Sequence, residues 1–282
     1  MKHRRAVLIL PLLALTFGLL IWPTVVLALR SFQSTGDILQ ASSAAGFSFR
    51  NYASIVVDPY YRGALLHSIL LSLFVACGSI LLCLCPAWLF VRKEFPSKRF
   101  LRALFTLPMS FSGIIVGFIV VIMLGRIGFV PLVLERMTGR PWLSGLAYRF
   151  CGLVVAYIYF EIPRATLTLE SSLRKFNFQL EAAARSLGAN RWQRLMYVVL
   201  PLILPALLSA FAVTFSVSLG SFGVALIVSK RFSILPVELY DQLIGFLNTG
   251  LAAAMGVVLM LIAFVVNYSM RNLGRSEEER LG

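Results

Sequence analysis

The sequence predicts an all-α polytopic membrane protein with about six transmembrane helices. Of its 282 residues, 59% are hydrophobic and only 13% are charged, which is far too apolar for an ordinary soluble domain. Apolar runs of spanning length recur along the chain, and in lipid each must be helical because unpaired backbone groups find no water there. With no strong tandem repeat and no low-complexity linker, a single domain over residues 1–282 is the simplest division.

The first apolar run resembles a signal peptide, but it continues for roughly 24 residues, whereas a secretory core usually has about 7–15. We therefore expect an uncleaved first span, although Val26 and Ala28 could mimic a cleavage site. Glu161 and Pro163 interrupt the fourth run, so we expect that span to be bent or shortened. The fifth run begins with prolines at 201 and 205, so we expect the fifth span to be bent or shortened as well. The six runs are residues 6–29, 64–91, 104–124, 146–169, 198–228 and 251–270.

The net charge of +14 fits membrane orientation better than nucleic-acid binding, because the basic residues lie between apolar runs. An even number of spans puts both termini on one side. If the N-terminus is inside, sixteen of the 26 basic residues lie in inner segments, Arg164 at the inner edge of the fourth span makes seventeen, and the remaining nine lie in outer loops. This bias predicts cytoplasmic termini and places residues 92–103 and 170–197 in the cytoplasm.

Motifs of catalysis and metal binding are missing from the sequence. It contains no GxxxxGK[ST] phosphate loop, no HExxH and no GxSxG, and His3 and His67 are far apart. Nothing in the spacing of Glu161, Glu238 and Asp241 indicates an active site, so we expect neither an enzyme nor a metal site. The four cysteines are best explained as small hydrophobic residues: Cys77, Cys83, Cys85 and Cys151.

The segment of residues 180–201, which we call the elbow, has the composition of a soluble helix–turn–helix. Gly188 is placed to end the first helix in a left-handed cap, and Asn190 can begin the next one. Small alanines leave a slim helix, and basic residues offer donors to acidic groups of a partner. Leu200-Pro201 anchors the second arm where it enters the bilayer, so the elbow and the fifth span can move together.

The elbow resembles the loop signature of permease subunits of binding-protein-dependent ABC importers. The pattern is a Glu-Ala-Ala cluster, then Gly188-Ala189, and then an aliphatic residue, Val198, two before Leu200-Pro201. Residues 49–52 (Phe-Arg-Asn-Tyr) and 159–163 (Tyr-Phe-Glu-Ile-Pro) are also similar to that family, as are His67-Ser68 and Pro86-Ala87, so the resemblance covers nearly the whole chain.

The resemblance implies a type I ABC importer (MetI-like) permease fold with a cytoplasmic coupling loop at about residues 170–197. That loop would dock on a separate ATP-hydrolysing subunit, since this chain lacks a phosphate loop. The implied partners are two ABC ATPase subunits carrying ATP–Mg²⁺, a second permease chain (homologous or identical), a periplasmic solute-binding protein and membrane lipid. The implied location is a bacterial inner membrane. The resemblance implies no cofactor in this chain and no nucleic-acid partner. The residues that the resemblance assigns to coupling are Glu181, Ala182, Ala183, Ala184, Arg185, Gly188, Ala189, Arg191, Leu200 and Pro201.

One position departs from the family pattern. Counting back from Gly188, the usual Glu position is Ala182, and Glu181 lies one residue earlier. This shift rotates a side chain by about 100° on a helix. Glu181 is therefore expected to contact the partner differently, to cap the start of the helix, or simply to lie favourably near a helix N-terminus.

Polar residues of the central spans are candidates for the solute path, because they are costly in lipid unless they face protein or water. For the small residues, close helix packing is an equally good explanation. Glu161 could attract a cationic solute or pair with Arg164. The resemblance favours a polyamine cargo, with ferric, thiamine, phosphonate and oxyanion importers as relatives. A secondary transporter and a membrane enzyme are the alternatives, but the sequence has neither convincing inverted repeats nor a catalytic constellation. The path candidates are Ser110, Ser112, Tyr157, Glu161, Thr214, Ser218 and Ser221.

Overall fold

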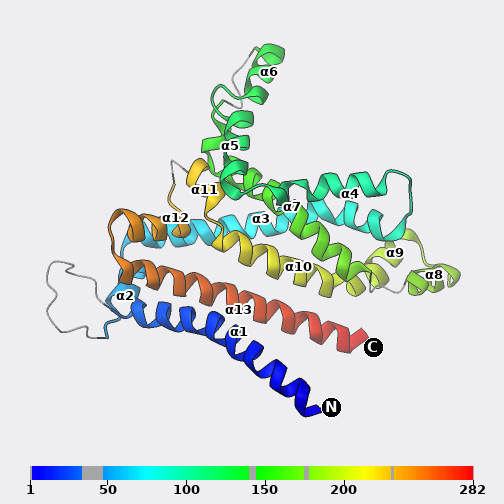
Figure 1. The fold of residues 1–282 in the computed structure, drawn as a ribbon. Helices are drawn as coiled ribbons and strands as arrows, with labels where there is room; N and C mark the ends of the chain where they lie inside the picture. Colours follow the sequence, from blue (N-terminus) through cyan, green and yellow to red (C-terminus); the bar gives the residue numbers. More distant parts are fainter. Residues whose placement is uncertain (1, 34–46, 140–143, 175–177, 230–231, 282) are drawn as a thin grey trace, which may run out of the picture. The chain divides into compact units, whose positions relative to one another are not determined.

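The computed structural model describes residues 2–33, 47–139, 144–174, 178–229 and 232–281 of the chain. Within these ranges the chain is helical, and its only β-type pairing is one isolated bridge between Gln33 and Phe47. The fold is traced in Figure 1. Five of its helical stretches are long and apolar enough to cross a membrane: Pro59–Arg92, Gly113–Thr138, Phe150–Leu173, Arg191–Gly220 and Thr249–Arg275. The expected first span corresponds to a further helix, apolar over Leu15–Ser31. These findings confirm the all-α polytopic fold class.

The helices fall into two compact units, of which the first comprises Met1–Leu65 and Leu235–Met260. Its parts are held by polar contacts near helix ends. Asn51 donates to the backbone carbonyl of Ser31, and the Tyr60 hydroxyl donates to Glu238 over 2.6 Å. This unit contains α1 (Lys2–Ser31), α2 (Arg50–Val57), the start of α3 (Pro59–Arg92), α12 (Leu235–Tyr240), the π-helical turn η4 (Asp241–Gly245) and the start of α13 (Thr249–Leu281).

The second unit comprises Leu66–Ile234 and Leu261–Gly282. Its central helices α3, α7 and α10 share a buried apolar cluster that includes Ala87, Leu169 and Ile203. Besides the remainders of α3 and α13 it contains α4 (Lys98–Thr106), η1 (Leu107–Ser110), α5 (Gly113–Leu124), α6 (Phe129–Thr138), η2 (Leu146–Tyr148), α7 (Phe150–Leu173), α8 (Phe178–Ser186), α9 (Arg191–Arg194), the π-helical turn η3 (Leu195–Val199), α10 (Leu200–Gly220) and α11 (Gly223–Val228).

Two of the expected spans have different bounds in the structure. The run at 104–124 is not one helix, because α4 gives way to the 3₁₀ turn η1, which contains Pro108, and a new helix begins at Gly113. The run at 198–228 is also divided, since α10 ends at Gly220 and Ser221 has an extended backbone before α11. Hydropathy is continuous across both breaks, so it cannot reveal them.

The fourth span is not shortened at Glu161 and Pro163, because helix α7 continues through both residues to Leu173. Both residues are buried. A proline is tolerated inside a membrane helix when neighbouring helices surround it, and α7 packs against α10. In the fifth span the π-helical turn η3 directly precedes α10, and α10 continues through Pro205.

Candidate functional site

The first arm of the elbow is α8, and it ends in the cap that the sequence predicts. Gly188 has a φ of 81°, in the left-handed region that favours glycine. The N–H of Ala189 donates to Ala184 over 3.1 Å, and that of Gly188 donates to Arg185 over 3.0 Å. These two bonds form a Schellman motif, which satisfies the last carbonyls of the helix and reverses the chain.

The second arm begins at Asn190, also as predicted. The Asn190 side chain accepts from the backbone N–H of Gln193, and the Gln193 side chain accepts from the N–H of Asn190, over 2.8 and 2.9 Å. This reciprocal capping box fixes the start of α9. From Arg191 the chain remains helical through η3 and α10 to Gly220, so the second arm and the fifth span form one continuous helical stretch.

The elbow exposes large apolar side chains that the sequence analysis did not select. Leu187 is 88% exposed, Tyr197 79% and Trp192 71%. Ala182 and Ala183 on α8 are exposed as well. Apolar side chains on a polar segment mark interaction surfaces when they gather together. Their occurrence within a segment rich in polar residues was the signal that could have identified them.

Glu181 faces its own chain. Its Oε2 lies 3.0 Å from Nη2 of Arg92, at the end of α3, and its Oε1 lies 3.8 Å from Nη1 of Arg194 on α9. The side chain is only 12% exposed. Glu181 also lies in the first turn of α8, where a carboxylate is favourable. The sequence could not predict the partner in α3, because basic residues at the end of an apolar run are explained by orientation in the membrane alone.

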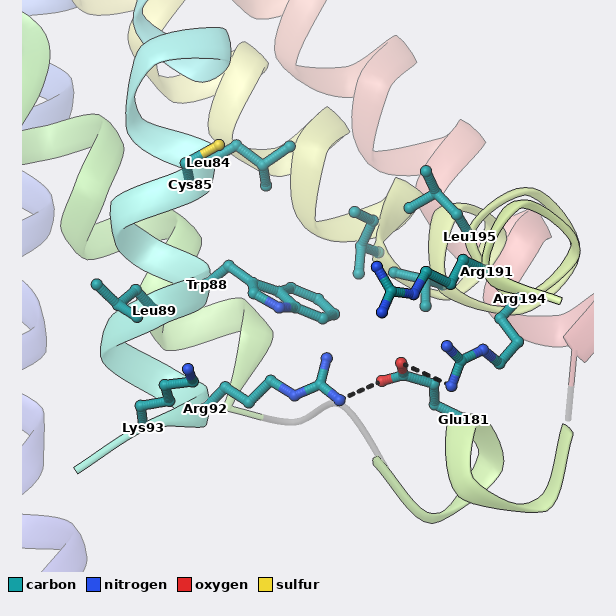
Figure 2. Close-up of a pocket in the computed structure, with 12 residues that line it drawn as sticks. Leu84, Cys85, Trp88, Leu89, Arg92, Lys93, Glu181, Arg191, Arg194 and Leu195 are labelled. Carbon is teal, nitrogen blue, oxygen red and sulfur yellow. Dashed lines mark ion pairs between the residues drawn. The ribbon is translucent and has the colours of Figure 1, made fainter. Parts of the chain in front are cut away.

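A cavity of about 710 Å³ lies between α3 and the elbow. Figure 2 shows Trp88 pointing into it from α3, with Arg191 opposite and Glu181 between Arg92 and Arg194. Its walls are apolar on the side of the membrane helices, where Leu84 and Trp88 also pack against the buried cluster of α3, α7 and α10. The cavity therefore has apolar residues of the membrane helices on one side and charged residues near the elbow on the other.

Other ion pairs join residues at or near the ends of neighbouring helices. Glu170 on α7 pairs with Arg102 on α4 and, over 2.7 Å, with Arg174 one turn further along. Glu94 pairs with Lys98, whose hydrogen bond lowers the pKa of the exposed Glu94 carboxyl.

Residues 175–177 of the predicted coupling loop lie outside the described residues.

The solute-path candidates have different surroundings. Ser110 and Ser112 are exposed, and the Ser112 hydroxyl caps α5 by accepting from the N–H of Ile115. The Tyr157 hydroxyl donates to the carbonyl of Ser221 over 2.6 Å, which joins α7 to the end of α10. Their role in solute passage remains a prediction.

Three buried polar groups stand out on α7 and α10. Glu161 is fully buried, and its Oε1 accepts from Arg164 over 2.7 Å, so the ion pair that the sequence left open is formed. Its Oε2 and the hydroxyls of Thr214 and Ser218 are buried and, among the described residues, have no hydrogen-bond partner. Buried hydroxyls without partners are costly unless something else binds them.

Metal ligands do not cluster anywhere in the described part of the chain, where no group of three or more His, Cys, Asp or Glu side chains is close enough to hold an ion. The expectation that this chain carries no cofactor stays a prediction.

Known proteins share this architecture. Residues 79–278 match the model of the family described as "Binding-protein-dependent transport system inner membrane component". The chain is 28% identical over 255 residues to the probable sulfate transport system permease protein cysT of Nephroselmis olivacea, covering 88% of this chain and 86% of that protein. It is 32% identical over 170 residues to the molybdenum transport system permease protein ModB of Escherichia coli K12, covering 60% of this chain and 72% of the relative.

Solved structures agree on the fold. A bacterial ABC transporter involved in the import of the acidic polysaccharide alginate matches with a TM-score of 0.74, and its complex with an alginate pentasaccharide-bound periplasmic protein matches with 0.73. Both matches are 18% identical and cover 98% of this chain and 96% of that chain. The chain therefore belongs to the family of binding-protein-dependent transport system inner membrane components. It is a multi-pass membrane protein and a permease subunit of an ABC importer of this kind.

Proposed function

We propose that the elbow is the surface by which this permease docks on a separate ATPase subunit at the cytoplasmic face of a bacterial inner membrane. The observation that carries the proposal is the rigid reversal at Gly188, which presents Leu187 and Trp192 to solvent while the second arm runs on into α10. ATP-driven movement of the docked subunits would then act on the fifth span directly. Two ATPase subunits, a second permease chain and a periplasmic binding protein complete the assembly.

Copurification tests the docking surface. Leu187→Asp places a charge at an 88% exposed apolar position and is expected to remove the ATPase subunit from the purified permease. Phe47→Asp is the matched control, because Phe47 is 79% exposed but lies in the predicted outer loop. Retention of the ATPase by the Leu187 variant, at wild-type levels, would exclude the elbow as the docking surface.

We further propose that the cargo is an oxyanion of the sulfate or molybdate class. The two curated relatives described above are named for sulfate and molybdenum transport, and the expectation of a polyamine finds no support among them. The ion pair of Glu161 agrees with this proposal, because Arg164 offsets the negative charge of this buried carboxylate. The hydroxyls of Thr214 and Ser218 suit an anion.

Uptake measurements decide between cargo classes. Proteoliposomes containing the whole importer with its binding protein should accumulate labelled sulfate or molybdate, and unlabelled oxyanion should compete. Spermidine and ferric iron should neither accumulate nor compete. Accumulation of spermidine would restore the polyamine prediction and refute the oxyanion proposal.

A further inference from the structure

The carboxylate of Glu181 is turned into the molecule. Its two neighbours toward the C-terminus, Ala182 and Ala183, are exposed, whereas Glu181 is 12% exposed and lies between the guanidinium groups of Arg92 and Arg194. Position 182, one residue later and about 100° further around the helix, is exposed, so the place of Glu181 on α8 directs its side chain toward α3.

Aromatic side chains reinforce the same contact. The ring of Phe178 on α8 packs edge-on against that of Trp88 on α3, with centroids 5.7 Å apart and an angle of 76°. The Arg92 guanidinium lies 5.7 Å from the Trp88 ring and 5.8 Å from the Phe178 ring. We call these four residues, Trp88, Arg92, Phe178 and Glu181, the α3–α8 cluster.

The α3 end of the cluster is fixed in the core of the unit. Trp88 packs against the buried apolar cluster that α3 forms with α7 and α10. The α8 end belongs to the elbow, whose two arms are also linked by the Glu181–Arg194 contact. A displacement of α8 that keeps these contacts must therefore move the end of α3 as well.

We propose that Glu181 is a positioning residue inside the permease. Through its ion pair with Arg92, a movement of the elbow is transmitted to α3. We call α3 the second lever, because it is the second helix by which movement of the elbow reaches the spans. The continuous helix from α9 into α10 is the first lever. This inference rests on the proposed function of the elbow. It assigns Glu181 to transmission within the chain and not to contact with the ATPase.

A double-mutant cycle tests this role. Glu181→Gln, Arg92→Gln and the double variant are reconstituted with the ATPase subunits and binding protein, and uptake per ATP hydrolysed is measured. Each single variant should lower this ratio about 1.5- to fivefold, the range expected for a partly exposed charge pair. The double variant should lose no more than the Glu181 variant alone, because the Glu181–Arg92 pair is broken only once.

Controls separate transmission from folding and docking. Glu94→Gln makes the same chemical change in a neighbouring inner segment, but Glu94 is 88% exposed and its ion pair with Lys98 lies within one turn, so the ratio should stay at the wild-type value. Arg92→Lys, which keeps the charge, should recover part of the loss. All variants should be inserted at equal levels and should copurify with the ATPase.

Three outcomes would overturn the inference. Additive losses in the cycle would show that Glu181 and Arg92 act independently. Loss of the ATPase from the Glu181 variant alone would show that this carboxylate contacts the ATPase. If the wild-type chain itself binds no ATPase subunit, the proposed function fails, and the second lever fails with it.

Discussion

At residue 188 the backbone adopts a conformation that only glycine and, less readily, asparagine tolerate. A Cβ there would meet no atom within 4 Å, so substitution acts through backbone strain alone. The cost for a β-branched residue is about 1–2 kcal/mol, concentrated at the point where the chain reverses. The orientation of the elbow depends on this one residue.

Gly188→Val is expected to insert normally but to lower uptake relative to ATP hydrolysis, because the exposed surface of the elbow and its second arm no longer keep their relative orientation. Gly188→Asn, which tolerates the left-handed region, should retain most of the coupling. The measurement is uptake and ATPase activity in the same proteoliposomes. Wild-type coupling in the Val variant would refute this role.

Glu161→Gln tests the buried ion pair on α7. The substitution leaves Arg164 without a charged partner beside a fully buried site, which should lower the stability of the complex by roughly 1–3 kcal/mol. Solute selectivity should not change, since the carboxylate is engaged by Arg164. Thermal unfolding of the purified complex and competition uptake measure both effects. Altered selectivity would place Glu161 in the solute path.

At the scale of elements, glycine permits a close approach between α5 and α11. A Cβ on Gly223 would lie 3.0 Å from the backbone nitrogen of Ile114 and 3.2 Å from the Cα of Gly113. Both contacts are with backbone, which cannot move aside. Small residues permit such packing between membrane helices, and the two helices lie side by side (Figure 1).

Gly223→Ala should therefore destabilise the permease by about 1–3 kcal/mol, despite the better helix propensity of alanine. The same exchange at Gly220, where a Cβ meets nothing within 4 Å, should be neutral or slightly stabilising. Thermal unfolding of both variants in the same detergent gives the comparison. Equal midpoints would show that α5 and α11 are not packed as described.

Local signals in the sequence predicted the two caps of the elbow, because Gly188 and Asn190 act through hydrogen bonds with residues a few positions away. Hydropathy predicted the spans but not the breaks at η1 and between α10 and α11, which depend on backbone bonding. The pairing of Glu181 with Arg92 could not be predicted, since it depends on how α3 and α8 meet in three dimensions. Only the family pattern marked Glu181 as unusual.

At the scale of the whole molecule, the predicted orientation of the chain in the membrane rests on charge alone. Sixteen of 26 basic residues fall in the predicted inner segments, among them Arg92, Arg185 and Arg194 around the elbow. The proposed docking surface, the second lever and the direction of coupling all require the elbow to lie in the cytoplasm.

Labelling of position 187 with a membrane-impermeant maleimide tests that requirement most directly. Leu187→Cys, in a chain whose four native cysteines are replaced, puts a thiol at an 88% exposed site of the elbow. Phe47→Cys reports the opposite side. We predict that position 187 reacts only in inverted vesicles and position 47 only in intact spheroplasts; reaction at position 187 in intact spheroplasts would contradict the account.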